Sequence, residues 1–293
     1  MAARAPIARR YARDGVELNY WDWEPSGAAA VTALFGHATG FHGRLWDQVI
    51  HRLPWGWRCI AMDFRGHGQS SAPSEKTAYH WDELAADTEA LLAELELKDI
   101  LGVGHSIGGC IITMAAEQRP GTFSGLVLVD PSIMDPQDRT LPTPPRFASG
   151  GSSISDGARK RRRQWESVEE MHDSLRTKRI FKRWDDDVFR DYCQHGLVPN
   201  EEVFELACLP ESEAAVFDHS ITSDPWPLLH TLQMPVTVMH GLMKDGLPST
   251  TSSRLVERLP DATDIPVEEC DHFIPMQRPD FVAKEVMRAQ AKL

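Results

Sequence analysis

Short apolar runs alternate with amphipathic stretches along most of the chain. Residues 81–97, for example, repeat their apolar positions every three or four residues, as one face of a helix does. By this pattern we expect strands at 16–23, 31–35, 58–62, 100–103, 126–129, 235–239 and 264–268. We expect helices at 45–53, 81–97, 110–118, 249–259 and 280–292. Strands that alternate with helices predict an α/β fold whose sheet is parallel, with right-handed crossovers.

The alternation breaks between residues 132 and 226. Residues 136–145 are rich in proline, and 148–157 have the Gly/Ser composition of a mobile loop. Charged helical patterns follow over 159–184 and, in pieces, over 187–215. We therefore predict a core domain of residues 1–131 and 227–293, into which 132–226 are inserted as an α-helical cap.

A basic run, Arg159–Arg163, begins the charged part of this cap. Acidic residues follow at ion-pairing distance along a helix, namely Glu166, Glu169, Glu170 and Asp173. We interpret the run as a solvated helix face rather than as a site for an anionic partner.

A serine stands at the apex of a predicted strand–turn–helix unit, in Gly104-His-Ser106-Ile-Gly108. Gly104 and Gly108 flank Ser106 at positions where a sharp turn leaves no room for a Cβ. Such a turn holds the serine in a strained conformation with its hydroxyl exposed. The amides of the following helix point at any anion that forms beside the serine. The pattern predicts that Ser106 is a nucleophile.

A serine hydroxyl needs a base whose pKa is near the working pH, which favours histidine. His272 follows the last predicted strand and therefore lies at the same rim of the sheet as Ser106. We predict that it is the base. His105 neighbours Ser106 but should point the other way around the turn, and His67 should tie down its own Gly-His-Gly loop.

An acyl-transfer intermediate also needs hydrogen-bond donors for its oxyanion. The amide of Ile107, directly after the serine, is one candidate. Thr39, in the small-residue loop after the 31–35 strand, is best placed to give the second.

Composition narrows the classes of partner. The net charge of −12 argues against nucleic acid, because there is no overall basic field to attract phosphates. The five cysteines include no Cys-x-x-Cys pair, so neither a disulfide framework nor a zinc site is predicted. No signal-peptide core and no apolar run of membrane-spanning length occurs, so we expect a cytoplasmic protein without a membrane partner.

Several motifs, taken together and in order, resemble the α/β-hydrolase superfamily. They are His37-Ala-Thr-Gly-Phe41 with Trp46, Asp63-Phe-Arg-Gly-His-Gly-Gln-Ser70, Gly104-His-Ser-Ile-Gly-Gly109, Val129-Asp-Pro131 and Asp271-His-Phe273. The resemblance covers about residue 10 to residue 293, and the cap is its least recognisable part. It implies a mostly parallel eight-stranded sheet with helices on both faces, a Ser-acid-His triad and no cofactor or metal.

The acid of that triad has three candidates. Most of the superfamily carries it in a Gly-x-x-Asp pattern after the penultimate strand. Here Gly241-Leu-Met-Lys-Asp245 is one residue too long and puts Lys244 in register, so Asp245 needs a shifted loop. A minority, similar to certain lactone hydrolases, carries the acid after the strand that follows the nucleophile helix, where Asp130 stands. We favour Asp130, keep Asp245 as its rival, and regard Asp271 as badly aimed because it adjoins the histidine.

These residues predict a serine hydrolase that cleaves a small-molecule carboxylic ester or lactone, and the nine tryptophans suggest a bulky apolar or aromatic acyl or alcohol group in it. Candidates for contacting the substrate are Phe41, Trp46, Met134, Phe147, Trp184 and Phe217. The same triad is also compatible with a C–C bond hydrolase or an acyltransferase. A further alternative is a protein of this fold that binds a small molecule without catalysing a reaction. The sequence leaves both a monomer and a homodimer open.

Overall fold

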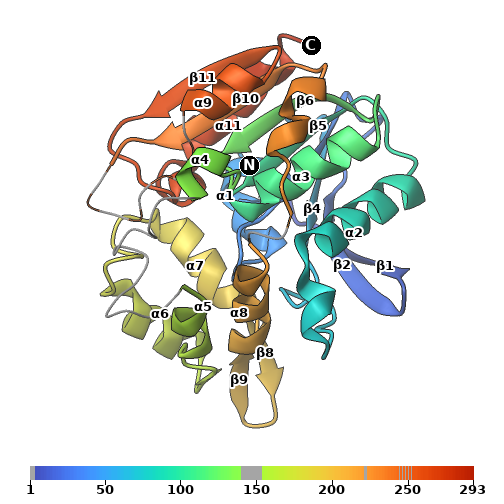
Figure 1. Cartoon of the computed structure of the whole chain (residues 1–293). Helices are drawn as coiled ribbons and strands as arrows, with labels where there is room; N and C mark the ends of the chain where they lie inside the picture. The colour runs from blue at the N-terminus through green and yellow to red at the C-terminus, as the bar shows by residue number, and fades with distance from the viewer. Residues whose placement is uncertain are drawn as a thin grey trace.

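An eight-stranded sheet runs through the middle of the molecule (Figure 1). The computed structural model describes residues 4–139, 154–220, 223–243, 253–293 and the single residues 245, 247, 249 and 251. Across the sheet the strands are β1 (Ile7–Arg13), β2 (Val16–Trp23), β4 (Trp57–Met62), β3 (Val31–Gly36), β5 (Ile100–His105), β6 (Phe123–Val129), β10 (Val236–Gly241) and β11 (Ala262–Val267). The pairs β1–β2 and β2–β4 are antiparallel, and every other neighbouring pair is parallel.

The predicted fold class is confirmed. Every strand expected from the apolar runs is present, and most differ from their expected bounds by three residues or fewer. The edge strand β1 has no counterpart among the predicted strands, because most of its residues are exposed or half-buried and its sequence, IARRYAR, has no buried alternation.

Helices cover both faces of the sheet. On one face lie α2 (Trp81–Glu94), α3 (Ile107–Gln118) and α9 (Ser253–Arg258), and on the other α1 (Asp47–Ile50) and α11 (Pro279–Gln290). Alternate residues of a strand serve the two faces, since Leu34 of β3 packs with α2 and α3 while Phe35 packs with α1. The helix expected at 45–53 is shorter: it consists of the 3-10 helix η1 (Gly43–Trp46) followed by α1.

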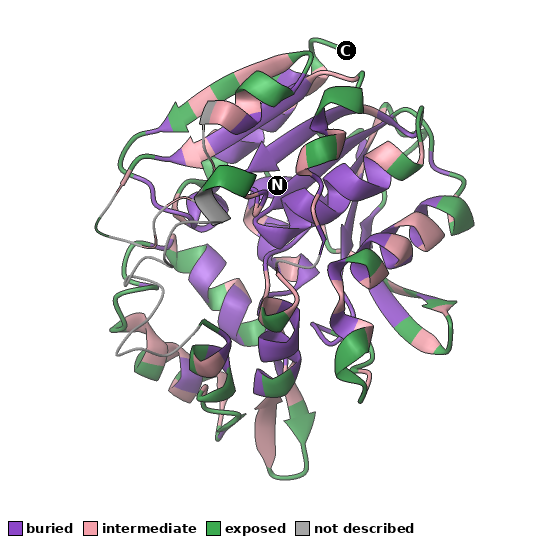
Figure 2. Cartoon of the chain, viewed as in Figure 1, coloured by how far each residue is buried: buried purple, intermediate pink, exposed green. Residues whose placement is uncertain are grey.

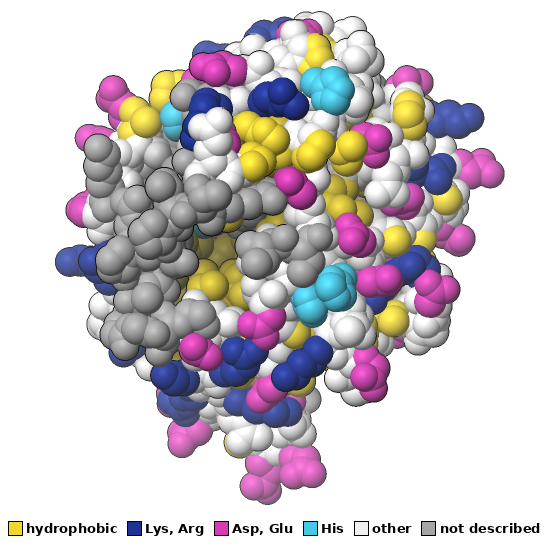
Figure 3. Space-filling model, viewed as in Figure 1, with side chains coloured by type: hydrophobic (Ala, Val, Ile, Leu, Met, Phe, Trp, Pro, Cys, Tyr) yellow, Lys and Arg dark blue, Asp and Glu magenta, His cyan; other side chains and the backbone are white. Residues whose placement is uncertain are grey.

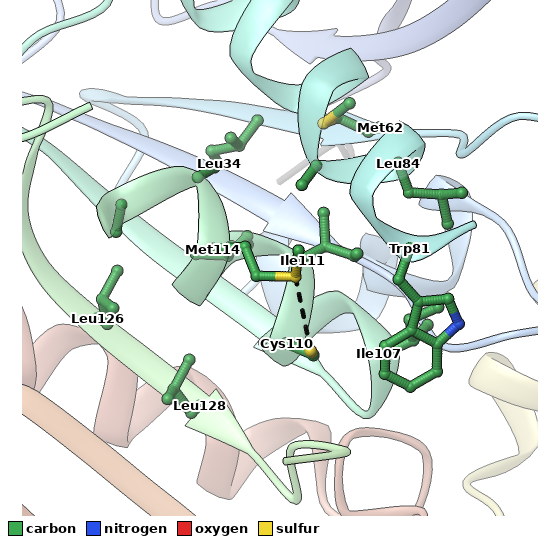
Figure 4. Close-up of a cluster of buried hydrophobic side chains, with 14 of the residues drawn as sticks. Leu34, Met62, Trp81, Leu84, Ile107, Cys110, Ile111, Met114, Leu126 and Leu128 are labelled. Carbon is green, nitrogen blue, oxygen red and sulfur yellow. Dashed lines mark hydrogen bonds between the residues drawn. The ribbon is translucent and has the colours of Figure 1, made fainter. Parts of the chain in front are cut away.

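The helix that follows the serine is buried along most of its length (Figure 2). Figure 4 shows Ile107, Cys110, Ile111 and Met114 of α3 packed between the sheet and α2. The Cys110 thiol lies 4.0 Å from the Met114 sulfur, within the buried cluster on this face of the sheet. Deep burial fixes the position of α3 and therefore of the turn at its start.

The segment between β6 and β10, which we call the insertion, contains the helices that we expect and, in addition, three short strands. Its elements are α4 (Pro136–Arg139), α5 (Ile154–Arg159), β7 (Gln164–Trp165), α6 (Val168–Arg176), α7 (Asp186–His195), β8 (Leu197–Asn200), β9 (Val203–Leu206), α8 (Pro210–Asp218) and the 3-10 helix η5 (Trp226–Thr231). Its strands form an antiparallel sheet in the order β7-β9-β8. These strands have only two to four residues each, too few for a recognisable alternation. Residues 154–157, expected in a mobile loop, belong to α5, and 148–153 lie outside the described residues.

The five cysteines are all buried and free, so none forms a disulfide. Within the described part of the chain, no helix is both long enough and apolar enough to cross a membrane.

Candidate active site

The ends of three adjacent parallel strands meet at one rim of the sheet. The register pairs His105 of β5 with Val129 of β6, and Val129 with Met239 of β10. Ser106 and Asp130 each follow their strand directly, so both reach the same rim. Each has a positive φ, +55° for Ser106 and +44° for Asp130. A positive φ is strained in a residue with a side chain and marks sites where the surroundings enforce the conformation.

The glycines around Ser106 are required by close approach of backbone atoms. A Cβ on Gly104 would lie 2.5 Å from the carbonyl oxygen of Gly108. A Cβ on Gly108 would lie 2.2 Å from the carbonyl oxygen of Gly36 and 2.7 Å from that of His37. The start of α3 therefore lies directly against the loop that follows β3.

Ser106, His272 and Asp130 form a continuous chain of hydrogen bonds. His272 Nε2 lies 3.0 Å from Ser106 Oγ, and His272 Nδ1 lies 2.8 Å from Asp130 Oδ1. All three residues are buried, Asp130 completely. The structure thus brings the predicted nucleophile and base together with the acid that the sequence analysis favours.

Further groups hold the Asp130 carboxylate. Its second oxygen accepts the amide of Gly241, the last residue of β10, at 3.0 Å. Burial alone would raise the pKa of Asp130, but the charge and hydrogen bond of His272, the Gly241 amide and the Ser249 hydroxyl together lower it below its ordinary value. Asp130 therefore stays ionised opposite the imidazole.

The rival acids have other partners. Asp245 is exposed and forms an ion pair with Arg183 of the insertion at 2.9 Å. Asp271 accepts the amides of Phe273 and Leu247 and the side-chain amide of Gln277, so its carboxylate is turned away from the imidazole. Lys244, which stands in register with the usual acid, lies outside the described residues.

The loop after β3 has two of its amides already engaged. Gly40 N–H donates to His67 Nε2 at 3.0 Å, and Phe41 N–H donates to the carbonyl of Ala38 at 3.2 Å. The amide of Thr39 has no hydrogen-bond partner among the described residues. Ile107 is the first residue of α3, where amides have no partner within the helix.

Two buried histidines fasten this loop to the loop after β4. His37 Nε2 accepts the amide of Phe64 at 3.1 Å, and His67 Nε2 accepts that of Gly40. Burial lowers the pKa of His67 to about 4 and that of His37 well below its ordinary value. Neutral rings keep these nitrogens as acceptors, so His67 ties down its loop as the sequence predicts.

His105 supports His272 from behind. Its Nε2 lies 2.8 Å from the carbonyl oxygen of His272, and the two ring centroids are 5.0 Å apart. Burial, and then the neighbouring His272, lower the pKa of His105 to about 3. His105 is therefore a neutral donor that fixes the backbone of His272.

An aromatic cluster lies beside these residues. Phe41 packs edge-on against Trp184 of the insertion, with ring centroids 5.5 Å apart. Phe273, next to His272, lies 5.4 Å from Trp184 and 6.0 Å from Phe41. On the face of the molecule that Figure 3 shows, hydrophobic side chains lie on the floor of a hollow.

The remaining predicted contact residues are more scattered. Trp46 lies in the core with its ring centroid 5.3 Å from that of Phe35, and its contact with substrate stays a prediction. Met134 and Phe217 are half-buried and stay predictions. Phe147 lies outside the described residues.

The basic run of the insertion is not one solvated helix face. α5 ends at Arg159, and the following arginines turn towards separate acids. Arg162 pairs with Glu170 at the surface, as expected, but Arg161 turns inward to Glu213 and the hydroxyl of Tyr192. A Cβ on Gly40 would lie 2.7 Å from Glu213 Oε1, so this ion pair lies against the loop that carries Thr39.

One group of metal-type side chains occurs among the described residues. Asp47, Asp191 and His195 place ligand atoms within 4.8 Å of one another, where α1 meets α7. Arg44 already donates three hydrogen bonds to the Asp47 carboxylate. An arginine so placed supplies the positive charge that a cation would bring.

Sequence reasoning missed one residue that touches the serine. The hydroxyl of Ser132 lies 3.0 Å from Ser106 Oγ, and the Ser132 amide donates to the carbonyl of Ser106 at 2.9 Å. Only its position, two residues after Asp130, could have pointed to Ser132 in the sequence. That position becomes informative only when Asp130 is known to face the site.

Comparison with known proteins identifies the family of the chain. The family model described as "Alpha/beta hydrolase family" matches residues 33–285. The chain belongs to this family. Among solved structures, E-2-(acetamidomethylene)succinate hydrolase superposes with a TM-score of 0.81 at 21% identity, over 98% of this chain and 99% of that one. An esterase from Thermogutta terrifontis superposes with a TM-score of 0.66 at 20% identity, over 98% of both chains. At such identities the likeness establishes the α/β-hydrolase fold alone.

Curated relatives within the family match over shorter stretches. A non-heme chloroperoxidase of Streptomyces lividans is 37% identical over 129 residues, which are 43% of this chain and 45% of that protein. Lipase LipV of Mycobacterium tuberculosis is 33% identical over 121 residues, 40% of this chain and 43% of that protein. The chain thus spans less than half the length of these two relatives.

Proposed function

We propose that this α/β hydrolase is a serine hydrolase that cleaves a carboxylic ester or lactone through an acyl-enzyme on Ser106. The observation that carries the proposal is the unbroken hydrogen-bond chain from Ser106 Oγ through His272 to Asp130. A serine with an oriented histidine and a buried carboxylate is the arrangement that activates a hydroxyl for acyl transfer. The names of two relatives, a lipase and a monoglyceride lipase, are consistent with an ester substrate.

In the acylation step, Ser106 Oγ attacks the carbonyl carbon and its proton passes to His272 Nε2. Asp130 accepts a hydrogen bond from the Nδ1–H of His272, stays ionised, and stabilises the imidazolium that forms. The tetrahedral intermediate collapses as the bond from carbon to the leaving oxygen breaks, and that oxygen takes the proton from His272. Water, with His272 as its base, then releases the acid and restores Ser106.

We assign the oxyanion to the amides of Ile107 and Thr39. Ile107 N–H begins a helix, whose positive end favours an anion. The amides of the two residues after Thr39 in its loop, Gly40 and Phe41, already donate hydrogen bonds, whereas the amide of Thr39 is available. The close contact between Gly36 and Gly108 brings this loop against the start of α3.

We assign Phe41 and Trp184 to the wall of the substrate pocket, with Met134 and Phe217 as further candidates. Phe41 adjoins the oxyanion loop, and both rings pack on Phe273 beside the base. An aromatic wall suits a bulky apolar or aromatic acyl or alcohol group. Five free, buried cysteines fit a reducing compartment, and we propose the cytoplasm.

The proposal is tested with p-nitrophenyl acetate and a fluorophosphonate probe. We expect the wild type to turn over the ester and to be labelled at Ser106, as mapped by mass spectrometry. Ser106→Ala should lose both, and a folded wild type that shows neither turnover nor labelling contradicts the proposed function.

A further inference from the structure

A second serine hydroxyl touches the proposed nucleophile. Ser132 Oγ lies 3.0 Å from Ser106 Oγ, the same distance as His272 Nε2 on the other side. Ser132 reaches this position because it follows Asp130, whose positive φ turns the chain back over the serine. A single stretch, Asp130-Pro131-Ser132, therefore contacts both the base and the nucleophile.

The direction of each hydrogen bond follows from the chemistry of the chain. The ionised Asp130 only accepts, so His272 Nδ1 carries a proton, and in the neutral imidazole that serves as the base Nε2 is then the acceptor. Ser106 must then donate its hydroxyl proton to His272 Nε2. With that proton used, Ser106 Oγ can only accept from the Ser132 hydroxyl.

We propose that Ser132 is a further catalytic residue, whose hydroxyl donates to Ser106 Oγ and stabilises the negative charge that develops there as the proton leaves. This inference rests on the proposed function of Ser106. Hydrogen bonds to charged groups are stronger than those to neutral ones, so the bond tightens as Oγ loses its proton. It lowers the barrier to attack without binding the ester more tightly.

The side chain of Ser132 can be tested apart from its backbone. Ser132→Ala keeps the backbone amide of residue 132, whose hydrogen bond to the Ser106 carbonyl stabilises the turn. Thr and Val at this position have nearly the same shape, and only Thr retains a hydroxyl. Ser124→Ala is a matched control, because it removes a half-buried hydroxyl whose one hydrogen bond, to the carbonyl of Ile100, lies at the other end of the sheet.

The readout is the second-order rate of inactivation by a fluorophosphonate. In this reaction the bond from Ser106 Oγ to phosphorus forms, the phosphorus–fluorine bond breaks, fluoride leaves, and the serine proton passes to His272. We expect Ser132→Ala to react about tenfold more slowly than the wild type. Ser124→Ala should react at the wild-type rate, and Ser132→Thr should react several-fold faster than Ser132→Val.

An unchanged inactivation rate in Ser132→Ala overturns the role of Ser132. If that variant does not fold, the Thr and Val variants decide, and equal rates in the two contradict the inference. Failure of the proposed function looks different, because the wild type itself is then not labelled at Ser106, and the inference falls with it.

Discussion

At the scale of single residues, the site depends on backbone approaches that allow no side chain. Ser106 has a strained φ, and the space beside it exists because Gly104 and Gly108 lack a Cβ. The carbonyl of Gly36 sits where a Cβ of residue 108 would be, so the loop carrying Thr39 lies against the start of α3. The proposed oxyanion donors can lie this close together only because residue 108 is a glycine and has no Cβ.

We predict that Gly108→Ala removes most esterase activity and lowers the free energy of unfolding by about 1–3 kcal/mol or more. The new methyl group must push away backbone atoms, which cannot rotate aside as a side chain can. Gly157→Ala is the matched control, because nothing lies within 4 Å of its Cβ position in α5. It should leave activity unchanged and raise the free energy of unfolding by about 0.5–1 kcal/mol. Urea unfolding and ester assays measure both, and a fully active, equally stable Gly108→Ala variant contradicts this account.

At the scale of elements, an ion pair within the insertion lies against a loop of the core. Arg161, after α5, and Glu213, on α8, form an ion pair that lies against Gly40. Arg161 also donates to the hydroxyl of Tyr192 on α7 at 2.8 Å. Both contacts lie within the insertion, and the close approach of Glu213 to Gly40 places this part of the insertion against the loop that carries Thr39.

We predict that Glu213→Gln lowers the free energy of unfolding by about 2–4 kcal/mol, because it leaves the charge of Arg161 without its carboxylate. The same change should reduce kcat more than it raises KM, since the affected loop carries Thr39 rather than the pocket wall. Glu211→Gln, on the same helix, removes an exposed partner of Arg163 and should cost less than about 0.5 kcal/mol. Equal stability losses in the two variants would show that the Arg161–Glu213 pair has no special role.

At the scale of the whole molecule, more of the fold than of the site could be predicted from the sequence. Apolar runs of strand length and helical spacing are local patterns, and they predicted the sheet. The choice between Asp130 and Asp245 is not local, because it depends on where His272 points and on Arg183, which draws Asp245 away from the site. The same holds for Arg161, whose partner Glu213 lies 52 residues along the chain.

The short strands of the insertion escaped prediction for a related reason. β7, β8 and β9 have two to four residues and are stabilised by pairing with one another rather than by their own pattern.

The buried histidines predict how stability depends on pH. The pKa is lowered to about 3 for His42, about 4 for His67 and about 3 for His105, and well below the ordinary value for His37, chiefly by burial. Between about pH 6.5 and pH 4 the unfolded chain therefore binds more protons at these sites than the folded one, so stability falls as the pH falls. Asp191 acts in the opposite direction, because burial raises its pKa to about 7.

We predict that the free energy of unfolding decreases from pH 6.5 to pH 4.5, by up to about 1.4 kcal/mol per pH unit for each such histidine. His67→Gln should make this decrease shallower by about 1 kcal/mol per pH unit, and Asp191→Asn should make it steeper by a similar amount. Urea unfolding at several pH values measures all three slopes. A wild-type stability that is flat or rises over this range would contradict the assignment of neutral, buried histidines.

The central claim, that Asp130 orients His272 for the attack by Ser106, is tested most directly by comparing Asp130→Asn with Asp245→Asn. The kcat for p-nitrophenyl acetate is measured in both variants at one pH, with equal loading of folded protein. We predict that Asp130→Asn lowers kcat on the order of 10³- to 10⁴-fold, because the imidazole loses the carboxylate that holds its tautomer. Asp245→Asn, which removes an exposed partner of Arg183, should stay within about threefold of the wild type. The reverse result, or full activity in both variants, would contradict the proposed triad.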